Sequence, residues 1–269
     1  MSKYSCFKDK FEEMYSLYNR REYVNPDPLI FLYDYSELKD REIAGIIASG
    51  LAYGNVKQIL KSVSKVLVVM KKSPYDYITS NTETDFENDF KGFKHRFTTD
   101  RELVLFLKGI KHVLNDYNSL YECFSNGYKE SHDTIYPALI HFVSELKMHK
   151  QNKNSLLPDP LKRSALKRLF LYLRWMIRKD EVDPGGWDNI PCSKLIIPLD
   201  THMFNISRSI NITHRKSADL TTAMEITNAF KLINDNDPVK YDFSLTRMGI
   251  HQDFNINSFL MECKMINPG

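Results

Sequence analysis

Lys167 is a candidate nucleophile because of its place on a predicted helix. Apolar residues at helical spacing predict a helix over 164–179 with a buried stripe made of Leu166, Leu169, Phe170, Leu173, Met176 and Ile177. Lys167 lies at the flank of this stripe, so we expect its amine to be partly desolvated. Desolvation disfavours an ammonium ion, and a neutral amine can form a Schiff base. The alternative is a surface lysine whose ammonium group reaches solvent.

Asp200 is the candidate partner of that amine. It ends the sequence Pro198-Leu199-Asp200 and opens a predicted helix in which Met203 and Ile206 point inward. Its carboxylate can cap the amide of His202 or Met203 and gains from the helix dipole. The same charge could stabilise a cation that develops as a glycosidic bond breaks. A plain helix cap is the alternative.

Positive charge is concentrated around the candidate lysine. The chain has a net charge of only +3, but the segment 161–179 contains seven basic and no acidic residues, namely Lys162, Arg163, Lys167, Arg168, Arg174, Arg178 and Lys179. Helical spacing puts Lys167, Arg174 and Arg178 on one face. Such a face could contact phosphate, or it could simply be solvated.

The remaining sequence predicts a mostly helical protein with almost no sheet. Amphipathic patterns predict about ten helices, at 3–20, from Asp40 to Leu51, over 56–70, 101–115, 117–126, 134–147 and 164–179, after Asp200, from a Thr222/Glu225 capping box to Ile233, and after Pro238. Ser73-Pro74 is interpreted as a helix end and Asn81–Asp89 as an acidic stretch.

We therefore predict an all-α fold in one domain over 1–269, built as a bilobal helical bundle. The polar, proline-ended segment near 148–160 is the predicted linker between the lobes. The four cysteines are widely scattered and form no CxxC pair, so we expect free thiols and no metal. There is no secretory leader pattern and no run of about 18 apolar residues. The expectation is a soluble, cytoplasmic monomer that needs no cofactor.

Two motifs suggest a family. The helix Leu166–Met176, LKRLFLYLRWM, and the turn Ile197–His202, IPLDTH, resemble an uncharacterised bacterial domain-of-unknown-function family. That family is in turn similar to the helix-hairpin-helix DNA glycosylases, above all the archaeal 8-oxoguanine enzymes. In those enzymes a catalytic lysine precedes an apolar helix and a catalytic aspartate follows in a P-[VL]-D turn. The first similarity covers most of the chain, and the second concentrates in 40–70 and 160–250.

The resemblance implies roles for particular residues. Lys167 would attack the sugar C1′ carbon, and Asp200 would activate or stabilise that carbon. His202 matches a position that touches DNA phosphate, and Asn55 falls where such enzymes insert a wedge residue into the duplex. Each has a simpler alternative, as a helix-start residue for His202 and a turn residue for Asn55.

The phosphate-binding hairpin departs from the family pattern. Where those enzymes have LPGxGxxTA, this chain has Pro158–Ala165, PDPLKRSA, without a glycine. Close approach of backbone amides to phosphate is therefore not expected. Lys162, Arg163, Ser164 and the helix start would have to hold phosphate instead, together with Arg174.

Three functions remain open at this point. The first is a base-excision repair enzyme, a glycosylase and AP lyase acting on double-stranded DNA with a damaged base such as 8-oxoguanine. The second is a non-catalytic nucleic-acid-binding protein that retains the fold. The third is an RNA or nucleotide target, which the small net charge leaves open. Trp187, in a loop after two glycines, could stack on a base or cover the core, and we favour the core.

Overall fold

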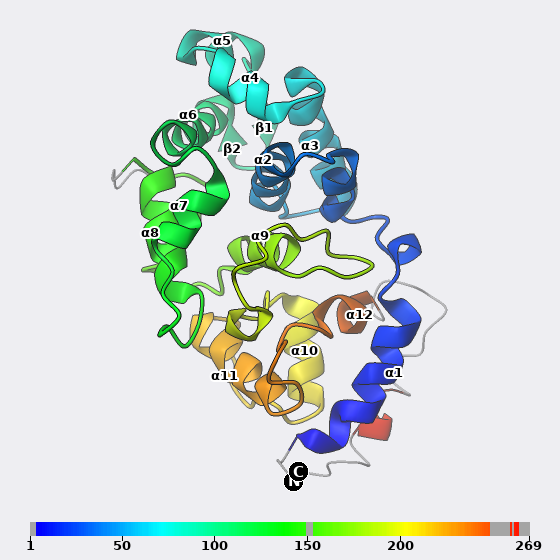
Figure 1. Ribbon diagram of the computed structural model, residues 1–269. Coiled ribbons are helices and arrows are strands. Elements are labelled where there is room, and N and C mark those ends of the chain that lie inside the picture. Colours follow the sequence, from blue (N-terminus) through cyan, green and yellow to red (C-terminus); the bar gives the residue numbers. More distant parts are fainter. Residues whose placement is uncertain (1–3, 149–152, 248–258, 260, 264–269) are drawn as a thin grey trace.

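Helix α9, Lys167–Ile177, runs through the middle of the molecule and separates the other helices into two groups (Figure 1). The computed structural model describes residues 4–148, 153–247, 259 and 261–263. The described part is mostly helical, and this confirms the predicted all-α class.

The first group is built from the continuous stretch 38–146. It contains α2 Leu38–Gly50, α3 Val56–Met70, α4 Pro74–Ser80, α5 Glu83–Asp89, α6 Asp100–Tyr117, α7 Leu120–Asn126 and α8 Tyr136–Leu146. Two short antiparallel strands, β1 Lys94–His95 and β2 Thr98–Thr99, form a ribbon between α5 and α6. Helix α2 packs on α9, and Gly45 makes the close approach possible because a Cβ there would lie 3.1 Å from the Tyr172 ring.

The second group joins the two ends of the described chain. Helix α1, Lys8–Tyr18, packs against α12, Asp242–Arg247, and α10 packs against α12 as well (Figure 1). Helices α10, Thr201–Ser209, and α11, Leu220–Lys231, complete the group. The 3₁₀ turns are η1 Ser5–Phe7, η2 Arg21–Tyr23, η3 Pro28–Asp34 and η4 Cys192–Lys194.

Several helix ends differ from the predictions. Helix α9 starts at Lys167 instead of 164 because Leu166 adopts a left-handed conformation, with φ of 51°. Helix α11 begins after Asp219, whose side chain accepts the Thr222 amide, so the predicted Thr222/Glu225 capping box is wrong. Thr222 itself is buried within the helix.

The sequence analysis missed two short helices. Helix α4 starts at the Ser73-Pro74 pair that was interpreted as an end, because the Ser73 hydroxyl caps the helix and proline suits its first turn. Helix α5 lies in the acidic stretch and has a capping box between Thr82 and Asp85. Each helix has only seven residues, too few to show a clear periodicity.

The predicted linker is packed where the structure describes it. Residues 149–152 lie outside the described part, but Leu156 and Leu157 are buried. The Ser155 amide and the Asn154 side chain donate to Glu102, and Arg168 of α9 donates to the carbonyls of Ser155 and Gly50. Ser155 therefore joins α9 to α6, and Arg168 joins α9 to α2.

The core has a polar contact at Trp187. This side chain has no exposed surface, and its Nε1 donates to Glu42 at 2.9 Å. The preferred interpretation of Trp187 as a core residue is confirmed. No helix among the described residues has the length and apolar character needed to cross a membrane.

Candidate functional site

A cavity of about 310 Å³ lies where the two groups of helices meet. Both groups of helices and α9 line this cavity. The side of the first group is formed by Ala52, Gly54, Val56 and Ile59, and α9 adds Lys167, Leu171 and Arg174. The remaining wall consists of Pro26, Asp27, Pro28, Pro198, Asp200, His202, Asp242, Phe243, Thr246 and Arg247. Small-molecule pockets span roughly 300–1,000 Å³, so this cavity is at the small end of the range.

Lys167 and Asp200 face each other in this cavity. Lys167 Nζ lies 3.8 Å from Asp200 Oδ2, and the side chains are 37% and 21% exposed. The Asp200 Oδ1 atom accepts the Met203 amide at 2.8 Å. Asp200 is thus both the helix cap that position predicted and a carboxylate on the cavity wall. The structure brings together the two residues that the sequence selected.

Asp242 supplies a second, deeply buried carboxyl group. It is 2% exposed, and burial raises the pKa of Asp242 to about 6 although the nearby Arg174 guanidinium opposes this shift. Oδ2 accepts from Arg174 Nη1, whereas Oδ1 has no hydrogen-bond partner among the described residues. The group can therefore change between donor and acceptor near neutral pH.

Arg247 is the matching unsatisfied donor. It is 3% exposed, and Nη2 donates to Asp27 Oδ2. Its guanidinium carbon lies 4.7 Å from the centre of the Phe243 ring. Nε and Nη1 have no partner in the part of the chain that the structure describes. A buried polar group without a partner costs about 1–3 kcal/mol, so a ligand that satisfied these groups would gain affinity.

Comparison with known proteins identifies a family. A family described as a protein of unknown function, DUF2400, matches residues 27–251. The chain belongs to this family. The matched stretch includes the cavity residues Lys167, Asp200, Asp242 and Arg247. No curated protein and no solved structure matches the chain, so no helix-hairpin-helix glycosylase is among its matches.

The placement of Arg174 in the DUF2400 chain does not fit the predicted phosphate contact. The side chain is 3% exposed, and its guanidinium pairs with Asp183 at 3.2 Å and with Asp242. Arg178, one turn further on, pairs with Asp180, Asp183 and Asp237. The shared helical face predicted for Lys167, Arg174 and Arg178 is thus mainly a buried ion-pair network that joins α9 to α12.

Two of the predicted DNA contacts, His202 and Asn55, lie at or beside the cavity. His202 is exposed and lines it. Asn55 is exposed, and its side chain accepts the Lys57 amide at 3.0 Å as the cap of α3. Its neighbour Gly54 lines the cavity, but Asn55 does not.

Lys162, Arg163 and Ser164 are exposed and absent from the cavity wall. The Arg163 carbonyl accepts the Leu220 amide, and Ser164 forms an isolated bridge with Asp219. These backbone contacts fix the segment against the start of α11 and leave the side chains in solvent. The segment is therefore free to meet a partner just before α9.

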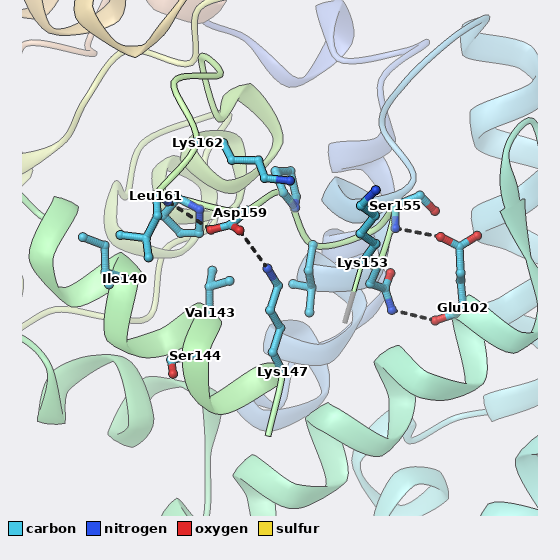
Figure 2. A pocket seen from close by; sticks show the side chains of 14 residues that line it. Glu102, Ile140, Val143, Ser144, Lys147, Lys153, Ser155, Asp159, Leu161 and Lys162 are labelled. Carbon is cyan, nitrogen blue, oxygen red and sulfur yellow. Dashed lines mark hydrogen bonds and ion pairs between the residues drawn. The ribbon is translucent and has the colours of Figure 1, made fainter. Parts of the chain in front are cut away.

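A larger hollow of about 820 Å³ lies elsewhere, between α8, Glu102 and residues 153–162 (Figure 2). Several of its polar groups already contact one another, because Lys147 is 3.9 Å from Asp159, and Glu102 accepts from Asn154 and Ser155. Lys162 is on its edge. We place the candidate site in the smaller cavity, because its wall includes the facing amine and carboxylate and the two residues, Asp242 and Arg247, that have unsatisfied buried polar atoms.

No role for Asp27, Asp242 or Arg247 followed from the sequence. Asp27 lies between Pro26 and Pro28, and Arg247 is 220 residues away from it. No local pattern reports such a contact. Among the described residues, no group of three His, Cys, Asp or Glu side chains could hold a metal ion.

Proposed function

We propose that this protein is a DNA glycosylase with lyase activity that removes a damaged purine, with 8-oxoguanine as the first candidate. The observation that carries the proposal is the pairing of Lys167 with Asp200 across a cavity between two groups of helices. A binding protein has no need of a facing amine and carboxylate.

In the proposed reaction Asp200 accepts a proton from the Lys167 ammonium group, which lies 3.8 Å away. The freed amine forms a bond to the sugar C1′ carbon. The bond from C1′ to the base breaks, and the base leaves with the electron pair and takes up a proton. The nitrogen loses a further proton, the C1′–O4′ bond breaks and O4′ takes up a proton, so that the sugar ring opens to an imine. Loss of the C2′ proton then expels the 3′ phosphate with the electron pair of the C3′–O bond. The proton that Asp200 received passes to the leaving base, and the restored Asp200 charge stabilises the cationic character at C1′.

The unsatisfied atoms of Asp242 and Arg247 suit the edges of an extruded base. Arginine donates well to the oxygen and nitrogen acceptors of guanine, and a carboxylate accepts from ring and amino N–H groups. The base must leave the helix to reach them, as in other enzymes that act on bases. These atoms are buried behind the cavity wall, so a base could contact them only if the two side chains rotated towards the cavity.

The alternative is a nucleic-acid-binding protein without catalysis. The sequence Pro158–Ala165 favours it, because it lacks the glycines that let backbone amides approach phosphate. The exposed Lys162, Arg163 and Ser164 would hold phosphate in either case.

Borohydride trapping separates the two functions. The protein is incubated with duplexes that contain 8-oxoguanine or another damaged purine, in the presence of borohydride, which reduces an imine to a stable amine. We expect a covalent adduct with at least one lesion and none with Lys167→Gln. If the wild type gives neither adduct nor free base with any lesion while it binds DNA, the enzymatic proposal is wrong.

A further inference from the structure

Phe97 is an unusually exposed aromatic residue at the turn between β1 and β2. Its side chain is 70% exposed, whereas the other phenylalanines of the neighbouring 86–106 region are buried or half-buried. Its neighbour Arg96 adopts a left-handed conformation, with φ of 52°. The two-stranded ribbon therefore holds an apolar ring out in solvent.

The ring stands on a rigid support. It stacks on Tyr53 at 5.9 Å between centres and 10° between planes. The Tyr53 hydroxyl donates to the His95 carbonyl at 2.9 Å and is also hydrogen-bonded to Thr98. The Arg168 guanidinium lies 4.9 Å from the Tyr53 ring centre. Phe97 is thus anchored through Tyr53 to the ribbon and to α9.

The ribbon adjoins the cavity. Arg96 packs on Gly54, where an added Cβ would lie 2.5 Å from Arg96 Nη1, and Gly54 lines the cavity that contains Lys167. The surroundings of the ring are basic, because the Arg96 guanidinium carbon lies 5.1 Å from the ring centre and Lys94, on the same ribbon, is exposed. An apolar ring set among positive charges matches a nucleic acid, which offers both stacked bases and phosphates.

We propose that Phe97 inserts between bases of a DNA duplex beside the extruded nucleotide, with Arg96 contacting the adjacent phosphate. The inference rests on the proposed function, because it assumes that a damaged base enters the cavity. Apolar side chains that enter a base step unstack it, and the opened step would accommodate the ring. Phe97 thereby takes the wedge role that the sequence suggested for Asn55, whose side chain caps α3.

The test uses a duplex with a tetrahydrofuran abasic-site analogue next to 2-aminopurine, whose emission rises when it is unstacked. This analogue cannot be excised, so the measurement reports binding alone. We expect the wild type to bind this duplex with increased emission. Phe97→Ala should lose the emission change and bind roughly 5- to 150-fold more weakly, the range typical of one lost stacking contact. Phe97→Trp should restore both.

Val68→Ala is the matched control, because Val68 on α3 is 71% exposed and lies outside the cavity wall. It should bind as the wild type does. Unchanged binding and emission with Phe97→Ala would overturn the inference, as would equal effects of Phe97→Ala and Val68→Ala. The inference would also be overturned if the wild type bound no DNA, for example because Phe97 contacts a protein partner.

Lys167→Gln separates this inference from the proposed function. If it loses borohydride trapping but keeps the emission change, both proposals stand. If the wild type unstacks the duplex but excises no base, the wedge role of Phe97 stands and the proposed enzymatic function is wrong. If Phe97→Ala excises the base as fast as the wild type, the enzymatic function stands and the wedge role is wrong.

Discussion

Asp242 accepts a hydrogen bond from Arg174 on the wall of the cavity, and its second carboxylate oxygen has no partner among the described residues. Burial raises the pKa of this carboxyl group to about 6 against the opposing charge of Arg174, and the negative charges of Asp200 and Asp183 add to the rise. Ionisation of Asp242 is therefore expected to affect ligand binding in the neutral range.

Asp242→Asn is expected to lower base release and to change its pH dependence. If the ionised carboxylate accepts from the base, activity falls as the pH drops through about 6. Loss of one charged hydrogen bond corresponds to about 1.5–3 kcal/mol, or roughly a 10- to 150-fold slower reaction at pH 7.5. Single-turnover base release between pH 5 and 8 measures both effects. If Asp242→Asn keeps the wild-type inflection in the pH profile of base release, a group other than Asp242 causes that inflection.

Asp200→Asn is expected to abolish base release and leave the fold intact. Asparagine caps a helix about as well as aspartate, so the Met203 amide keeps its acceptor. Asp200→Ala, in contrast, loses the cap and about 1 kcal/mol of stability. Thermal unfolding together with base release measures the two variants. Normal activity in Asp200→Asn would show that Asp200 serves only as a cap.

The Lys167–Asp200 pair was accessible from the sequence because both residues occupy positions that local rules define. Lys167 flanks the apolar stripe of α9, and Asp200 is the N-terminal cap of α10. The family resemblance then distinguished them from the many other lysines and helix caps. The helical pattern likewise predicted α2, α3 and α6 to α8, and in α3 and α6 the buried residues recur at helical spacing.

The misplacement of Arg174 shows where local rules end. Helical spacing put Arg174 on the same face as Lys167. In the structure Asp183, from a loop, and Asp242, from α12, pack on this face and form ion pairs with Arg174. The exposed ring of Phe97 also escaped detection, because an isolated phenylalanine in a sequence is normally assigned to the core.

Glu42 makes stability depend on pH. Burial raises the pKa of Glu42 from its ordinary value of 4.5 to about 7, although hydrogen bonds from Trp187, Leu120 and Tyr121 oppose the rise. The folded state therefore binds this proton more tightly than the unfolded chain does. The resulting contribution to stability is complete below pH 4.5 and is lost as the pH rises towards 7.

Trp187→Phe tests this interpretation. It removes the Nε1 donor that lowers the pKa of Glu42, so the loss of stability with rising pH should extend to higher pH and become larger in the variant. Urea unfolding at several pH values from 4.5 to 8 compares the variant with the wild type, and Glu42→Gln should flatten the dependence. Identical pH profiles for wild type and Glu42→Gln would exclude Glu42 as the group responsible.

Arg174→Met is expected to destabilise the protein by about 3–5 kcal/mol, because it leaves the buried Asp242 without its counter-charge and leaves Asp183 with Arg178 alone. Chemical unfolding at neutral pH measures this loss. The double variant Arg174→Met with Asp242→Asn should recover part of it, since the unpaired charge of Asp242 is gone. A surface role for Arg174 predicts a change of at most a few tenths of a kcal/mol for Arg174→Met instead.

Lys162→Gln and Arg163→Gln are expected to weaken DNA binding without regard to sequence or damage. Both side chains are exposed just before α9, where they can neutralise phosphates. Each contact that is lost should reduce the slope of log Kd against log salt concentration by about one. Lys179→Gln provides a control, because Lys179 is an exposed basic residue beyond the other end of α9. Fluorescence anisotropy with an undamaged duplex at 50–200 mM salt gives the slopes, and unchanged slopes in both variants would move the phosphate contacts to another surface.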